Sequence, residues 1–175
     1  MNPPTPNTFR SGEMMGDTVR WSEGRADAVS DFRARKFLVD HGLPEASLLF
    51  EADQGEPDIF ATDAGEEVLM IGSFDEDFHF FVKTRSGEVL FGLEQDPEPS
   101  FANSSLAAFV ECLRWVDREF PFYSFEDDSA VKAAAGDRVL EFLHSVDPEC
   151  VSAADGFWMS FVQDVGVGDY YEGAL

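Results

Sequence analysis

The amino-acid sequence predicts a single α+β domain, in which a twisted antiparallel sheet packs with helices. Three observations support this prediction. The 175 residues fit one domain with a sizeable core, since 44% of them are hydrophobic and eighteen are phenylalanine. Between residues 45 and 98, short apolar runs follow each other too closely for crossover helices, which favours a meander over a doubly wound sheet. Helical patterns lie on both sides of these runs, which is typical of α+β domains.

The sequence predicts an irregular or mobile N-terminal arm at residues 1–24. The domain itself is predicted at residues 25–175. The first twenty residues are rich in Pro, Thr, Asn, Gly and Met, and they show no sustained periodicity. They also lack the basic and then apolar run of a secretory signal. From about 25 to 40, apolar residues recur at helical spacing. Gly42 can take a left-handed conformation and Pro44 cannot continue a helix, so residues 41–44 should end it.

The next segment predicts four strands, at residues 58–62, 68–73, 78–83 and 89–93. In the third of these, apolar and mixed positions alternate, so that one face is apolar and the other carries one aromatic among polar groups. Residues 84–87 form a tight hairpin turn between the last two strands, with Gly87 at a positive φ.

Helices are predicted after residue 103. Asn103, Ser104 and Ser105 offer side-chain oxygens to the free amides of a helix start. An apolar stripe follows, formed by Leu106, Phe109, Val110, Leu113 and Val116. This helix should end near residue 120, a second should run from about 129 to 144, and a short C-terminal helix should contain Phe157, Trp158, Phe161, Val162 and Val165.

Acidic residues are unevenly distributed along the chain. The formal net charge is -23, and residues 1–40 contribute nothing to it, because they hold six basic and six acidic residues. Residues 37–82 contain no lysine or arginine but hold twelve carboxylates. A surface of one sign repels anions and speeds the approach of a cationic partner. The alternative interpretation is that the acidic surface only keeps the protein soluble.

Sequence patterns argue against the common enzyme and metal classes. The three histidines are scattered and no CxxC occurs, so zinc is not expected. Residues 75–77 are acidic, but Phe78, His79 and Phe80 replace the further ligands of a calcium loop. A nuclease of the PD-(D/E)xK type needs a carboxylate two residues before Lys83, where Phe81 stands, and the net charge opposes binding to nucleic acid. No cofactor is predicted.

The cysteines indicate the compartment. Cys112 lies in an apolar helical pattern, which predicts a buried thiol rather than a nucleophile. The chain has only two cysteines, Cys112 and Cys150, which favours a reducing compartment over a disulfide scaffold. We therefore infer a cytoplasmic location. The apolar runs are short and broken by charge, so no membrane association is expected.

Several segments together resemble a known family. The segments are FLVDHGLP at the end of the first helix, VLMIGSF and FFVKTRSGEVLFGLE in the meander, and FANSSLAAFVECL at the start of the next helix. They resemble the SUKH superfamily, which groups bacterial immunity proteins with yeast cell-wall-synthesis regulators, and most closely its group-four branch. The resemblance covers about residues 28–120 and extends to the terminal helix with Trp158. It implies an α+β domain without catalytic residues, which binds and neutralises a toxin, often a nuclease or a nucleic-acid deaminase.

We therefore predict a non-enzymatic immunity protein that binds a basic partner, a toxin domain, through acidic side chains flanking the sheet. The candidate acids are Asp53, Glu56, Asp58, Glu66, Glu67, Asp75, Glu76 and Asp77. Aromatic residues around Pro121 are a second candidate contact, namely Phe122, Tyr123 and Phe125, although the pattern favours a loop that covers the core. The alternatives are a regulatory or scaffold module without a toxin partner, and a metal-dependent hydrolase. The sequence leaves the oligomeric state open.

Overall fold

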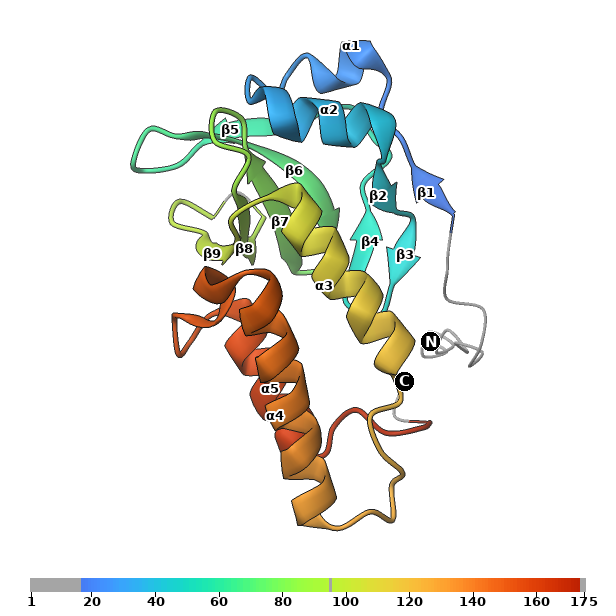
Figure 1. Ribbon diagram of the computed structural model, residues 1–175. Helices are drawn as coiled ribbons and strands as arrows, with labels where there is room; N and C mark the ends of the chain where they lie inside the picture. Colours follow the sequence, from blue (N-terminus) through green and yellow to red (C-terminus); the bar gives the residue numbers. More distant parts are fainter. Residues whose placement is uncertain (1–16, 95, 174–175) are drawn as a thin grey trace, which may run out of the picture.

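The computed structural model describes residues 17–94 and 96–173, which form a mixed α+β domain (Figure 1). Its main sheet has seven strands in antiparallel pairs. The strands are β3 (Ala46–Ser47), β4 (Phe50–Ala52), β5 (Ile59–Ala61), β6 (Glu67–Ser73), β7 (Phe78–Lys83), β8 (Val89–Leu93) and β9 (Ser100–Asn103). Strands β5 to β8 form the predicted meander, while β9, which was not predicted, extends it beyond β8, and β4 also pairs with β6. Gly87 closes the β7–β8 turn with a φ of 78°, as its position predicted.

Two short strands lie outside this sheet. Strand β1 (Thr18–Val19) pairs with β2 (Leu43–Pro44). Trp21, which follows β1 in the sequence, has a buried side chain. Residues 17–24, which the sequence assigned to the N-terminal arm, therefore pack on the domain. Residues 1–16 of that arm lie outside the described residues.

The single helix predicted from about 25 to 40 is wrong, because the structure has two helices there. Helix α1 (Glu23–Ala26) ends early, and α2 (Phe32–Asp40) begins after Asp31, whose carboxylate accepts a hydrogen bond from the N–H of Ala34. The amides of residues 30 and 31 instead donate to the carbonyl of Thr84 in the β7–β8 turn, which holds the break open. Gly42 then ends α2 with a φ of 74°, as predicted.

Three longer helices follow the sheet; the first and third pack against it, and the second packs on the other two. Helix α3 (Leu106–Glu119) begins at Ser105, whose hydroxyl accepts from the N–H of Ala108. Helix α4 (Ser129–Val146) is followed by a 3-10 turn at Pro148–Val151 and by α5 (Phe157–Val167). Figure 1 shows α3 crossing the sheet, α1 and α2 at the top of the view, and α4 and α5 paired at the lower left.

The core lies between the sheet and these helices. Its largest fully buried side chains include Phe50, Phe80, Phe109 and Trp158. Phe80 and Phe109 lie with ring centroids 4.8 Å apart, which joins β7 to α3. The stripe predicted on α3 is buried over its whole length. The predicted helices after residue 103 are thus confirmed by their packing.

A buried polar network joins the sheet edge to the C-terminal helices. The carboxylate of Asp147 accepts hydrogen bonds from Asn103 Nδ2 at 3.1 Å and from the N–H of Ser104 at 2.7 Å. The amide oxygen of Asn103 accepts from Trp158 Nε1 at 2.8 Å. The buried thiol of Cys112 lies beside this network, and contact with Cys150, burial and the nearby carboxylate of Asp147 raise its pKa. The donors of Asn103, Ser104 and Trp158 all have an acceptor in this network, and these hydrogen bonds join α5 to β9.

Candidate partner-binding groove

A surface hollow with a volume of about 530 Å³ lies where the ends of β7 and β8 meet helix α5. We call it the acidic groove. Its walls come from the sheet, from the loop before α5 and from the residues just after that helix. It is lined by Leu49, Phe74, Asp75, Phe78, Phe91, Gly92, Leu93, Asp96, Ser100, Asp155, Phe157, Ser160, Phe161, Asp164 and Tyr170.

The floor of the acidic groove is apolar and partly exposed. Phe78 and Leu93 are opposite partners in the β7–β8 pairing, on the face that carries the buried Phe80 two residues further along β7. Phe157 covers Phe91 with ring centroids 4.6 Å apart, but Phe78 stays 38% exposed and Leu93 51% exposed. The apolar face of the sheet therefore extends beyond the helices that cover it. Exposed apolar surface gathered in one hollow is typical of an interaction site.

Four aspartates surround this floor, and they come from four separate segments. Asp75 lies in the β6–β7 turn, Asp96 in the loop after β8, Asp155 before α5 and Asp164 on α5. Within residues 17–94 and 96–173, no ion pair involves any of the four. Their negative charge is consequently not neutralised by a neighbouring cation of the described chain.

Local hydrogen bonds hold two of these carboxylates in place. Asp75 Oδ1 accepts from the N–H groups of Asp77 and Phe78, at 2.9 and 2.8 Å, which closes the β6–β7 turn. Asp96 Oδ1 accepts from the N–H of Glu98 at 2.9 Å. Gly92 leaves room for the side chain of Asp96, because a Cβ at position 92 would lie 2.6 Å from Asp96 Oδ2. A partner would thus meet carboxylates that are already positioned.

At the α5 side of the groove, burial raises the pKa of two groups, and nearby negative charge adds to the shift. Burial raises the pKa of Asp164 above its ordinary value, and the nearby Asp169 raises it further. Burial raises the pKa of Tyr170 to about 12, and Asp164 and Asp169 contribute to this shift. A cation entering the groove would favour the ionised form of Asp164 and would relieve this repulsion.

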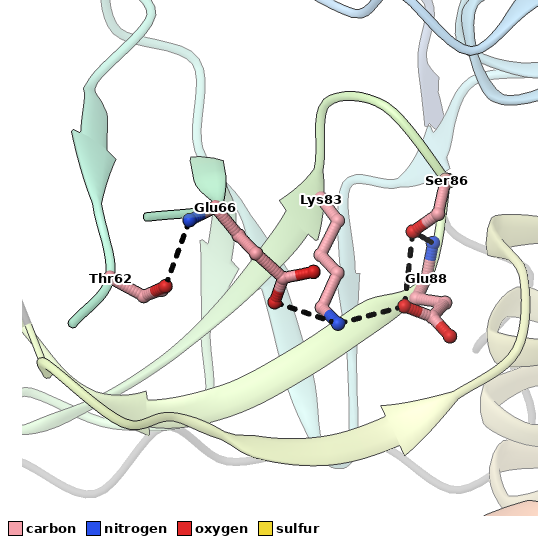
Figure 2. A network of polar contacts seen from close by, with 5 residues as sticks. All are labelled: Thr62, Glu66, Lys83, Ser86 and Glu88. Carbon is pink, nitrogen blue, oxygen red and sulfur yellow. Dashed lines mark hydrogen bonds and ion pairs between the residues drawn. The ribbon is translucent and has the colours of Figure 1, made fainter. Parts of the chain in front are cut away.

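Two of the predicted acids are instead engaged within the protein. Asp53 forms a 3.0 Å ion pair with Arg25, whose guanidinium also lies 4.1 Å from the centre of the Trp21 ring. Glu66 pairs with Lys83 at 2.9 Å, and Lys83 makes a second 2.9 Å pair with Glu88 (Figure 2). These pairs join α1 and the β5–β6 turn to the sheet, so the two carboxylates are only partly available to a partner.

The other predicted acids lie at different places around the sheet. Asp75 lines the acidic groove, and Glu76 and Asp77 are exposed in the same turn. Glu56, Asp58 and Glu67 are also exposed, in the loop before β5 and at the start of β6. Because β6 runs from Glu67 to Ser73, Glu67 and the acids after the strand lie at its opposite ends, whereas Asp58 lies beside its middle, where its carbonyl accepts a hydrogen bond from the N–H of Met70. The structure therefore brings only one predicted acid together with the groove.

The predicted aromatic contacts divide in the same way. Phe122 and Tyr123 are 8% and 6% exposed, and the hydroxyl of Tyr123 donates to the carbonyl of Val165 at 2.7 Å. These two side chains cover the core, so they present little surface to a partner. Phe125 is 66% exposed and lies 5.0 Å from the Tyr171 ring. It remains a candidate contact residue.

Sequence reasoning missed three of the four groove aspartates. Asp96, Asp155 and Asp164 are separated by long stretches of sequence, and only the fold places them around one hollow. A partial signal was present, because Phe74 and Phe78 flank the acidic turn at residues 75–77. In the described residues, no group of His, Cys, Asp or Glu is arranged to hold a metal ion. None of the described helices is long and apolar enough to cross a membrane.

Comparison with protein families identifies the chain. The model of the SUKH-4 immunity protein family matches residues 12–164. The chain belongs to this family. The match confirms the resemblance to the group-four branch and joins its two parts, residues 28–120 and the terminal helix, into one region that covers most of the chain. No curated protein and no solved structure matches the chain.

Proposed function

We propose that this SUKH-4 protein neutralises a toxin by binding one segment of the toxin in the acidic groove. This segment would carry basic side chains and an apolar side chain that anchors it. Membership of an immunity protein family implies a toxin partner in general. The observation that supports this particular surface is the combination of unpaired carboxylates with exposed Phe78 and Leu93 around one hollow. Aromatic and aliphatic anchors supply most of the affinity at protein interfaces, whereas charges at the rim steer the approach.

The chemistry of the groove favours a partner with lysine or arginine on either side of an apolar side chain. The apolar side chain would fill the space over Phe78 and Phe157, and the cations would meet Asp75 and Asp164. Toxins that act on nucleic acid have positively charged substrate sites, because those sites hold phosphates. A protein of net charge -23 can occupy such a site in place of the nucleic acid. We therefore place a nuclease or a nucleic-acid deaminase first among the possible toxins.

Inhibition of this kind needs no chemical turnover by the immunity protein. The carboxylates would act as fixed acceptors, and the toxin would lose activity because its substrate site is covered. The protein would act in the cytoplasm of the cell that must be protected, before an incoming toxin reaches its target.

The test compares two triple variants that remove the same charge. The groove variant replaces Asp75, Asp155 and Asp164 by Asn, and the control variant replaces Glu56, Asp58 and Glu67 by Gln, Asn and Gln. Both are measured by association kinetics against a toxin domain recovered by pull-down with the products of neighbouring genes. We expect the groove variant to bind more slowly at low salt and to depend less on salt, because screening weakens long-range attraction first. The control variant should behave like the wild type.

A third variant, Phe78→Ala, separates steering from anchoring. It should leave the association rate nearly unchanged and speed dissociation, because it removes an apolar contact without changing charge. If the groove variant and Phe78→Ala both bind like the wild type, the acidic groove is not the toxin site. If the control variant alone slows association, the acids before β5 and at the start of β6 carry the interaction instead.

A further inference from the structure

A second hollow, of about 410 Å³, lies along the exposed side of α3 between helices α2 and α4. We call it the α3 groove. Phe37 of α2 forms one wall and Phe142 of α4 forms the other. Trp115 lies between them and stacks flat against Phe142, with ring centroids 4.3 Å apart and an angle of 7° between the planes. The groove thus presents a preformed aromatic wall.

Arginines gather around the α3 groove, in contrast to the rest of the surface. Arg114 and Arg118 line it, one helical turn apart on α3. Arg33 lies one turn before Phe37 on α2, and Arg138 one turn before Phe142 on α4, so helical geometry places both on the groove side. Arg114 and Arg118 thus line the hollow, and Arg33 and Arg138 lie one helical turn from residues of its walls, in a chain with twelve basic residues and 35 carboxylates.

These arginines are largely without partners. Within the described ranges, Arg33, Arg114 and Arg138 form no ion pair, and Arg118 contacts only its neighbour Glu119, at 3.5 Å through Nε. The other charged residue that lines the groove is Glu111, toward the N-terminal end of α3. The positive charge at the C-terminal half of the groove is therefore available to an anionic ligand.

We propose that the α3 groove binds an acidic amphipathic helix of a second protein partner. Two carboxylates one turn apart on such a helix would match Arg114 and Arg118, which have the same spacing. An apolar side chain between the carboxylates would pack on Trp115 and Phe142, as in other complexes of a helix in a groove. The protein would then carry two docking surfaces of opposite charge preference. This inference does not depend on how the acidic groove is used.

A second copy of the chain fits the α3 groove poorly. In a two-fold dimer the same surface meets itself, and α3 is the floor of a hollow in both copies, so the helices could not reach each other. Each copy also carries a net charge of -23, which opposes association. A protruding helix with only local negative charge avoids both difficulties.

The experiment uses the full chain labelled with ¹⁵N and a stapled helical peptide as the probe. The peptide carries a leucine stripe flanked by two glutamates one turn apart, and a matched peptide carries glutamines instead. Binding is followed through the indole N–H signal of Trp115, assigned with Trp115→Phe. We expect a saturable shift with the glutamate peptide and a much weaker one with the glutamine peptide.

Variants then locate the binding. Arg114→Gln with Arg118→Gln should weaken the affinity about fivefold, the effect of losing two exposed ion pairs. The control, Arg20→Gln with Arg85→Gln, removes two unpaired arginines elsewhere and should change the affinity by less than about twofold. The proposal is overturned if the glutamate peptide causes no shift, if both peptides or both double variants behave alike, or if a single-stranded oligonucleotide binds there and the peptide does not.

Discussion

Asp117 tests how burial changes the pKa of a carboxylate, because this side chain is partly buried and has one hydrogen-bond partner. It lies near the end of α3, and its Oδ1 accepts a hydrogen bond from the N–H of Leu48 at 2.8 Å. Burial raises the pKa of this carboxyl from 3.8 to about 6, and the hydrogen bond from Leu48 lowers it only in part. The ionised form is thus disfavoured in the folded protein.

The sign of the effect follows from proton linkage. Between about pH 3.8 and pH 6 the folded protein retains a proton that the unfolded chain has lost, so the free energy of unfolding falls as pH rises through this window. A difference of about two pH units corresponds to about 3 kcal/mol at most. Solvent screening at this half-buried side chain reduces the expected cost at neutral pH to about 1–2 kcal/mol.

The substitution Asp117→Asn keeps an oxygen for Leu48 and removes the charge. We expect the variant to be more stable than the wild type by about 1–2 kcal/mol at pH 7.5, with the difference shrinking toward zero near pH 4. Urea denaturation of both proteins from pH 4.5 to 8 measures this difference, and Asp137→Asn on the exposed side of α4 is the control. A difference that does not change with pH would refute the reasoning.

Three further predictions concern stability and protonation. Leu106→Ala or Phe109→Ala should lower the free energy of unfolding by about 2–5 kcal/mol, because both side chains are fully buried; an unchanged melting temperature would mean that α3 does not pack as described. Asp147→Ala should cost about 2 kcal/mol or more in urea denaturation, since it leaves the donors of Asn103 and Ser104 unpaired, while Asp147→Asn should cost less. The hydrogen bond from Lys83 lowers the pKa of Glu88, so Lys83→Gln should raise that pKa in an NMR titration, and an unchanged value would contradict the network in Figure 2.

The regular elements were predictable because their signals are local. The apolar stripe on α3 and the turn at Gly87 depend on residues close together in sequence, and the structure has both where the pattern placed them. The break between α1 and α2 depends on a distant partner, the carbonyl of Thr84. Strands β1, β2 and β3 have two residues each, which is too short to show any periodicity. Such features are set by tertiary contacts that a single sequence does not reveal.

The candidate site was predictable only in its chemistry. Acidity and nearby aromatics drew attention to the turn at residues 75–77, but Asp155 and Asp164 join it through the docking of α5 against the sheet. That docking includes the hydrogen bond between Trp158 and Asn103, which lie 55 residues apart and whose pairing the sequence does not indicate. The same reasoning applies to the α3 groove, where three helices must meet before their arginines form a set.

Charge density alone is a poor guide to a binding surface in so acidic a protein. The stretch from residue 37 to 82 holds twelve carboxylates, yet Asp53 and Glu66 pair with cations that lie outside that stretch. A paired carboxylate contributes little to attraction at a distance, because its field is cancelled by its neighbour. An unpaired carboxylate beside exposed Phe78 can both attract a cation and guide an apolar side chain into contact. We therefore use unpaired charge next to exposed apolar surface as the criterion, and on this basis we propose a basic partner for the acidic groove and an acidic one for the α3 groove.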